Sequence, residues 1–199
     1  TMVDMNDVAD AAKESGHGSW ARWIGVYIGM LAVLLSIATM IGQNAEEDAA
    51  KANLDATNTW AFFQAKNIRR EQFRIAAENM RLLRAANTEL PSAAQSMIEA
   101  ELAKYDKKIA IYTSDKKRNE GLDELWVRGK ALEKERDDAL ARGPYFDYGE
   151  AFLQIAIVLA SVAIVTGGSG ALVLSIVIGI AGVVSVANGA FMFATLPGL

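Results

Sequence analysis

The sequence predicts an all-α integral membrane protein with three transmembrane helices and a long antiparallel helical hairpin, resembling a coiled coil, between the first and second spans. Charged residues are confined almost entirely to the middle of the 199-residue chain: Arg22 is the only charge between Trp20 and Gly42, and none occurs from Ala151 onward. Apolar runs of roughly 20 residues are long enough to cross about 30 Å of hydrocarbon as helices. The stretch 44–87 contains neither proline nor glycine, which favours helix.

The first apolar run is predicted to be a retained membrane anchor. Residues 1–19 form an N-terminal tail with four acidic residues and one lysine, so they lack the basic start of a signal peptide. The run itself has the length of a full span, and no small-residue cleavage site of the usual kind is evident. We therefore expect transmembrane helix 1 at 20–42.

An extramembrane helical hairpin is predicted for residues 43–143. Nothing in the sequence obliges the first helix to stop at the membrane, so the outgoing helix is expected to continue to about Ala86. Pro91 breaks the helical hydrogen bonding, which predicts a turn near 87–92.

The returning helix is predicted from about 93 to 141. Ser92 and Gln95 fit a capping box that starts it. Apolar residues spaced by four and three predict the seam between the two helices. They are Ile98, Leu102, Tyr105, Ile109 and Tyr112 on the returning helix, and Ala61, Ala65, Ile68, Ile75 and Leu82 on the outgoing one, widened by Phe73, Met80 and Leu83.

Pairing these two stripes places Gly121 beside Trp60, so we predict that Gly121 makes room for the indole. The seam has no apolar residue from 114 to 120. Two interpretations follow: the hairpin opens there, or the stretch is its solvated side.

The second apolar block is long enough for two spans and too long for one. Transmembrane helix 2 is expected at 144–167, a tight glycine-rich turn at 168–170, transmembrane helix 3 at 171–193 and a C-terminal tail at 194–199. Small residues recur at helical spacing in all three spans, which predicts close helix packing within one chain or between chains. They are Gly25, Gly29, Ala32, Ser36 and Thr39; Ala156, Ala160, Ala163 and Gly167; and Ser175, Gly179, Gly182 and Gly189.

A few polar residues near the spans are candidates for chemistry. Asp147 and Glu150 fit a cap at the start of the second span, the commoner role, or a proton or cation site at the membrane mouth. Gln154 and Asn188, inside the second and third spans, fit hydrogen bonds between helices, again the commoner role, or the lining of a pore. The acidic residues at 46–48 fit a solvated helix face or a ring that concentrates cations.

No catalytic, metal-binding or cofactor-binding residue is predicted. The chain has no cysteine, and its single histidine, His17, has no second ligand nearby. No nucleophile and base form a recognisable arrangement, so an enzyme is the least supported class. The net charge of −4 argues against nucleic-acid binding.

Two stretches resemble a known family. NTWAFFQAKNIRRE, with its core from Trp60 to Lys66, and FDYGEAFLQIAIVLASVAIVT, with Leu153 to Ala156, are similar to bacterial membrane proteins catalogued as domain of unknown function 4337. The layout of one span, a helical middle and a closing membrane hairpin is similar too. The resemblance implies a bacterial membrane location and supplies no activity, cofactor or catalytic residue. This chain departs from the family pattern in its last turn, GGSG, where relatives often carry basic residues.

The expected location is the bacterial inner membrane, with several spans. Two observations favour an exported hairpin. The basic residue Arg22 lies at the start of the first span, whereas the acidic residues Glu46 and Glu47 follow its end. The turn between the last two spans is often basic in the family. Basic residues before the second span favour a cytoplasmic hairpin, which is the orientation we expect. They are Arg128, Lys130, Lys134, Arg136 and Arg142.

Trp60, Ala61, Phe62 and Phe63 are four consecutive apolar residues, three of them aromatic, and together they cover nearly the whole circumference of a helix. A two-helix hairpin buries one side of such a helix, so the other side predicts a contact with a neighbouring subunit or partner. The predicted interface comprises Trp60, Phe62, Phe63, Lys66, Arg69 and Arg70.

These observations predict a membrane-anchored, self-associating helical scaffold or interaction protein. Its expected partners are the lipid bilayer, further copies of the chain and, as an accessory subunit, another membrane complex. The alternative is a homo-oligomeric channel or transport protein whose pore is formed by the transmembrane helices.

Overall fold

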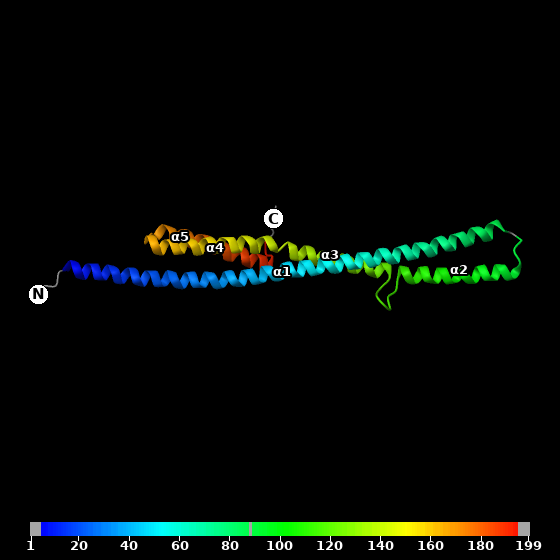
Figure 1. The fold of residues 1–199 in the computed structure, drawn as a ribbon, viewed down its shortest axis with the longest axis horizontal. Helices are drawn as coiled ribbons and strands as arrows, with labels where there is room; N and C mark the ends of the chain where they lie inside the picture. The colour runs from blue at the N-terminus through cyan, green and yellow to red at the C-terminus, as the bar shows by residue number, and fades with distance from the viewer. Residues whose placement is uncertain (1–4, 88, 195–199) are drawn as a thin grey trace. The chain divides into compact units, whose positions relative to one another are not determined.

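The computed structural model describes residues 5–87 and 89–194, with side chains from residue 18 onward. Its regular elements in these ranges are five helices: α1 (Met5–Ala86), α2 (Ser92–Thr113), α3 (Leu122–Leu140), α4 (Gly143–Thr166) and α5 (Ser169–Phe191) (Figure 1). The prediction of an all-α protein is confirmed. The predicted end of the outgoing helix at Ala86 also matches.

The two predicted tails fall partly outside the described residues. Residues 1–4 and 195–199 lie outside them, as does the side chain of His17. The backbone of 5–19, expected as a tail, belongs to α1. Of the C-terminal tail at 194–199, the structure describes only residue 194.

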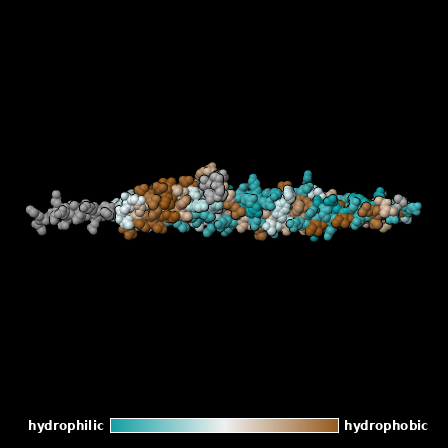
Figure 2. All heavy atoms as spheres, turned by 90° about the horizontal axis from the view of Figure 1, so that it is seen from above, coloured by the Kyte–Doolittle hydropathy of each residue, from teal (hydrophilic) through white to brown (hydrophobic). Residues whose placement is uncertain are grey.

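The chain divides into two compact units. The apolar unit comprises Thr1–Asp48 with Asp138–Leu199, and the charged unit comprises Ala49–Asp137. Three helical stretches are long and apolar enough to cross a membrane, and they lie within Gly18–Ala86, Leu122–Thr166 and Ser169–Phe191. Figure 2 shows one region whose surface is mainly hydrophobic (brown) and another whose surface is mainly hydrophilic (teal) with separate hydrophobic patches. This is the pattern expected of a chain with apolar and charged parts.

Helices α4 and α5 pack through small residues, as their sequence spacing predicts. Ala156 and Ala160 are fully buried. A Cβ atom added to Gly182 would lie 3.1 Å from the carbonyl oxygen of Gly149, so the two backbones approach closely. The hydroxyl of Ser175 donates a hydrogen bond of 2.6 Å to the carbonyl of Ala156, which satisfies a buried polar group inside the contact.

The turn between α4 and α5 depends on glycine. Gly167 has φ = +62°, in the left-handed region that glycine adopts without strain, and it ends α4. Helix α5 begins at Ser169, so the turn is shorter and earlier than the predicted 168–170.

The small-residue stripe of the first span has no counterpart within the described chain. Cβ atoms added to Gly25 and Gly29 would have nothing within 4 Å. Helix α1 buries Ile24, Leu31 and Ala38 instead, against α4 and α5. The apolar unit therefore uses the α4 and α5 stripes internally and leaves the α1 stripe exposed.

We expect Gly182→Val to destabilise the apolar unit by about 1–3 kcal/mol, because the added methyl groups would force α4 and α5 apart. Gly170→Val is the matched control on the same helix, since nothing lies within 4 Å of its added Cβ atom. Thermal unfolding of the detergent-solubilised protein measures both. Equal losses in the two variants would contradict this packing.

The returning segment is not one helix, contrary to prediction. It breaks between α2 and α3, over residues 114–121. Glu124, in the first turn of α3, accepts hydrogen bonds from the hydroxyl of Ser114 (2.6 Å) and the N–H of Asp115 (3.0 Å). Asn119 adopts a left-handed φ of 57°, which asparagine tolerates. The polar loop is therefore held by hydrogen bonds to the start of α3 and by Lys66 of α1, which pairs with Glu120 of the loop.

The start of α2 also differs in detail. The N-cap is Pro91, and no side chain caps the helix. Gln95 donates to the carbonyl of Leu90 (3.0 Å), outside the reciprocal pattern of a capping box. The helix begins where predicted, because Pro91 ends the preceding turn.

The predicted stripe on α1 lies mostly on the wrong face, and only Phe73 and Met80, which were predicted to widen it, belong to the buried face. Ile68, Ile75 and Leu82 are each about 60% exposed. The buried face lies on the other side and follows its own spacing of four and three. Its members are Ala49, Ala52, Ala56, Thr59 and Ala77, which are buried, with half-buried Phe63, Lys66, Arg70, Phe73 and Met80.

The predicted stripe on the returning segment is consistent with α2. Leu102 is buried. Phe73 of α1 packs against Tyr105 and Tyr112 of α2, with ring centroids 5.9 and 5.8 Å apart. Two apolar stripes at the same spacing compete for one helix, and the alanine-rich stripe allows the closer approach.

Candidate contact site around Trp60

An aromatic cluster joins α1 to α3 within the charged unit. The Trp60 ring lies edge-to-face with those of Phe63 (5.6 Å between centroids) and Trp126 (5.2 Å). The indole N–H of Trp60 donates a hydrogen bond of 2.9 Å to Glu133. Such edge-to-face pairs add about 0.5–1.5 kcal/mol each beyond burial, so this cluster fixes α3 on α1.

A glycine on α3 makes room for the indole. A Cβ atom added to Gly129 would lie 2.7 Å from Cζ2 of Trp60, closer than van der Waals contact allows. The prediction that Gly121 plays this part is wrong, because a Cβ there would meet Ser114 and Asp115 of its own loop and Glu124 at the start of α3. The break at 114–121 uses residues without advancing along α1 as a helix would, so a later glycine reaches Trp60.

The charges beside the cluster reinforce it. Lys130 donates a hydrogen bond of 2.7 Å to Glu133, and its Nζ lies 5.8 Å from the Trp60 ring centroid and 5.6 Å from that of Trp126. The hydrogen bond from Lys130, and then that from Trp60, lower the pKa of Glu133 despite the opposing effect of desolvation. Trp60 is therefore satisfied within its own chain.

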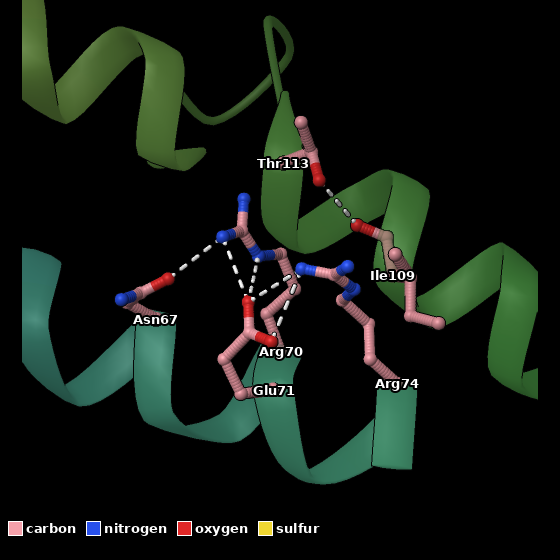
Figure 3. Close-up of polar contacts among 6 residues, drawn as sticks. All are labelled: Asn67, Arg70, Glu71, Arg74, Ile109 and Thr113. Atoms are coloured by element: carbon pink, nitrogen blue, oxygen red, sulfur yellow. Dashed lines mark hydrogen bonds and ion pairs between the residues drawn. The ribbon is translucent and has the colours of Figure 1, made fainter. Parts of the chain in front are cut away.

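The basic residues that follow are also largely engaged. Lys66 forms an ion pair with Glu120 (3.3 Å). Arg70 donates to Asn67 (2.8 Å) and to Glu71 (2.9 Å), and Arg74 shares the same carboxylate (Figure 3). These pairs consume hydrogen-bonding capacity that an external partner would otherwise use.

Among the residues of the predicted interface, Phe62 and Arg69 are the two whose side chains are exposed. Phe62 is 40% exposed, with Lys66 Nζ 4.7 Å from its ring centroid. Arg69 is exposed, and no hydrogen bond or ion pair holds it among the described residues. Trp60, Phe63, Lys66 and Arg70 instead make contacts within the charged unit. The predicted interface is thus divided between internal packing and a free surface.

A groove of about 400 Å³ adjoins this free surface. Phe62, Phe73 and Tyr112 supply aromatic walls, and charges of both signs supply the rim. Most of these charges are already paired, such as Arg118 with Asp115 at 3.4 Å. No group of three or more His, Cys, Asp or Glu residues suited to a metal lies among the described residues. The groove therefore combines aromatic walls with a rim of mostly paired charges.

Sequence reasoning missed the larger free surface, which is the exposed face of α1. Leu54, Ile68, Ile75 and Leu82 are each about 60% exposed in a helix stretch that carries many charges. The signal was present, because α1 carries two stripes at a spacing of four and three. The sequence prediction used only one of these stripes and placed it in the contact with the returning helix.

The expected cap by Asp147 and Glu150 is not found. Helix α4 begins at Gly143 with Arg142 as N-cap, and Pro144 stands in its first turn. Proline needs no hydrogen-bond partner there, so it starts the helix before Asp147. Glu150 instead faces Gly42 of α1, where an added Cβ would lie 3.5 Å from its carboxylate.

The two amides of the spans have separate surroundings. Asn188 donates to the carbonyl of Ala194 (2.8 Å) and accepts from its N–H (2.9 Å), so it closes the end of its own helix. Gln154 is exposed on α4 and makes no hydrogen bond within the part of the chain that the structure describes. The two do not bond to each other.

The described helices define an all-helical protein with three membrane-crossing candidates and a charged helical middle. The chain belongs to the family described as Domain of unknown function (DUF4337), which matches residues 20–192. The resemblance seen around Trp60 and Leu153 is thereby confirmed. Comparisons with curated proteins and with solved structures gave no match.

We expect Gly129→Leu to destabilise the charged unit by about 1–3 kcal/mol, because the added side chain would displace the Trp60 indole. Ala131→Leu, at an exposed position of the same helix, should change stability by no more than about 0.5 kcal/mol. Denaturant unfolding followed by tryptophan fluorescence compares them. A stable Gly129→Leu variant with an unchanged spectrum would show that the indole lies elsewhere.

We expect the charged unit to lose stability in acid through Glu133. Its pKa is lowered from 4.5 in the folded protein. The carboxylate therefore stabilises the fold above about pH 4.5, and this contribution disappears as the pH falls through the lowered pKa.

Unfolding temperatures at pH 7 and pH 3.5 test this. Glu133→Gln should lower the unfolding temperature at pH 7 and reduce the drop on acidification. Glu135→Gln, at an exposed position nearby, should leave the wild-type drop in place. An identical drop in wild type and Glu133→Gln would rule out the Glu133 contribution.

Proposed function

We propose that this protein is a membrane-anchored helical hairpin that self-associates and acts as a scaffold, without enzymatic activity. The observation that supports the proposal most directly is the exposed aliphatic face of α1 in the charged unit. Apolar side chains of this size, repeated along one face outside an apolar span, mark interaction surfaces more often than solvated ones.

Contacts between α1 and the returning helices support the hairpin. Arg81 of α1 pairs with Asp106 of α2 (2.8 Å), and Lys66 of α1 pairs with Glu120, which follows α2 in sequence. Trp60, which lies earlier in α1 than Lys66, donates a hydrogen bond to Glu133 of α3, which lies later in the chain than Glu120. Positions earlier in α1 therefore meet positions later in the return, the order that an antiparallel arrangement requires.

The apolar unit offers a second reason to expect association. Gln154 presents an amide without an internal partner on the outside of an apolar helix. In hydrocarbon, side chains of this kind form hydrogen bonds across helix contacts. A helix from another copy, or from a larger membrane complex, would supply that partner.

The proposed location is the bacterial inner membrane, with the hairpin in the cytoplasm.

We expect the protein to be oligomeric when extracted with its native lipids. Native mass spectrometry of polymer-extracted membrane discs measures the mass directly, and light scattering in mild detergent provides an independent value. Strictly monomeric protein by both methods would overturn the proposal. An oligomer that also carries a reproducible second protein would identify a larger complex.

A further inference from the structure

We infer that the exposed face of α1 is a coiled-coil seam that receives the same face of a second copy, parallel and in register. The inference rests on the proposed self-association and names its interface. The seam, here the outer seam, follows steps of four and three without interruption, and every member is exposed. Its members are Leu54, Asn58, Ala61, Ala65, Ile68, Gln72, Ile75, Asn79 and Leu82.

The order of residue types distinguishes the outer seam from a scattered apolar surface. Every d position is apolar: Leu54, Ala61, Ile68, Ile75 and Leu82. The a positions between Leu54 and Leu82 are polar or small, namely Asn58, Ala65, Gln72 and Asn79. Polar residues at a positions fix register and the number of strands in parallel coiled coils, because each amide finds its partner in the equivalent amide of the other strand.

The outer seam and the internal contact can be used at once. At about 100° per residue, the a and d positions lie roughly 150° around the helix from the face that carries Ala56, Phe63 and Ala77. That face is buried or half-buried within the charged unit. Binding a second copy would therefore leave the intramolecular contacts of Phe63 and Phe73 intact.

Membrane insertion favours a parallel arrangement. Helix α1 contains both a stretch apolar enough to cross a membrane and the outer seam. Two copies inserted in the same way direct their α1 helices to the same side of the membrane. An antiparallel pairing of the outer seams would require opposite insertion of the two copies.

The residues that flank the outer seam fit this pairing. In a parallel dimer, a g residue meets the e residue five positions later in the other strand. Gln64 would then meet Arg69 of the second copy, and Glu78 would meet Leu83. No like charges oppose each other in these pairs. Arg69, which lacks a partner within the described chain, gains an amide acceptor.

Disulfide cross-linking in native membranes tests the seam, because the chain has no cysteine of its own. Leu54→Cys and Leu82→Cys introduce single thiols at d positions near the two ends of the seam. Parallel, in-register copies bring each thiol next to its equivalent, within the short separation that a disulfide requires. We expect both variants to form covalent dimers under mild oxidation, in several-fold greater yield than a control.

Arg74→Cys is the matched control, since the Arg74 side chain is 59% exposed and lies off the outer seam. Cross-linking of only one seam variant would indicate an antiparallel contact centred near that residue, cross-linking of neither would indicate a staggered contact or an antiparallel contact centred elsewhere, and either result would overturn the inference. Equal cross-linking of all three would indicate random collision, with the same consequence.

The mass of the unmodified protein separates the two proposals. An oligomer whose seam variants do not cross-link would overturn the outer seam and leave self-association standing. A monomer would overturn both. Ile75→Asp provides a second measurement: it should reduce the oligomer fraction at least tenfold, with the helical content of the monomer unchanged.

Discussion

The packing of the Trp60 indole over Gly129 is the contact on which the rest of the charged unit depends. It leaves no space for a side chain on α3 at this point, and the hydrogen bond to Glu133 fixes the orientation of the ring. Once Trp60 faces α3, the rotation of α1 about its axis is set. The alanines and Phe63 then turn inward, and Ile68 and Ile75 turn outward. One aromatic contact thus selects which apolar face is available to a partner.

Close packing on a glycine also holds the apolar unit together, but here without a large aromatic side chain. Gly182 and Gly149 allow α4 and α5 to approach until backbone atoms touch, and Ser175 bridges the contact through a carbonyl. In lipid, apolar side chains gain little by leaving their surroundings, so close packing and hydrogen bonds must supply the association energy. The two units therefore achieve tight packing by different means, one with glycine under an indole and one with glycine against backbone.

The sequence was sufficient for the helical class, the end of α1 at Ala86 and the small-residue packing of α4 and α5, because these depend on local composition and spacing. It was insufficient for the face of α1, since two stripes satisfy the same periodicity, and the contacts that distinguish them, such as the packing of Trp60 on Gly129, involve residues far away in the sequence. The break at 114–121 rests on the hydrogen bonds of Glu124 with residues earlier in the chain, which spacing does not reveal. Asp147 has the sequence pattern of a cap, but Pro144 starts the helix before it.

The alanines buried on α1 have an entropic consequence. Ala49, Ala52 and Ala56 have no rotamers to lose on packing, whereas burying a long side chain costs up to about 2 kcal/mol of conformational entropy. This stretch is thus ordered without freezing side chains, but it also has no side chain that can swing aside. Any enlargement there must be absorbed by the distance between helices, so these methyl groups act as fixed spacers.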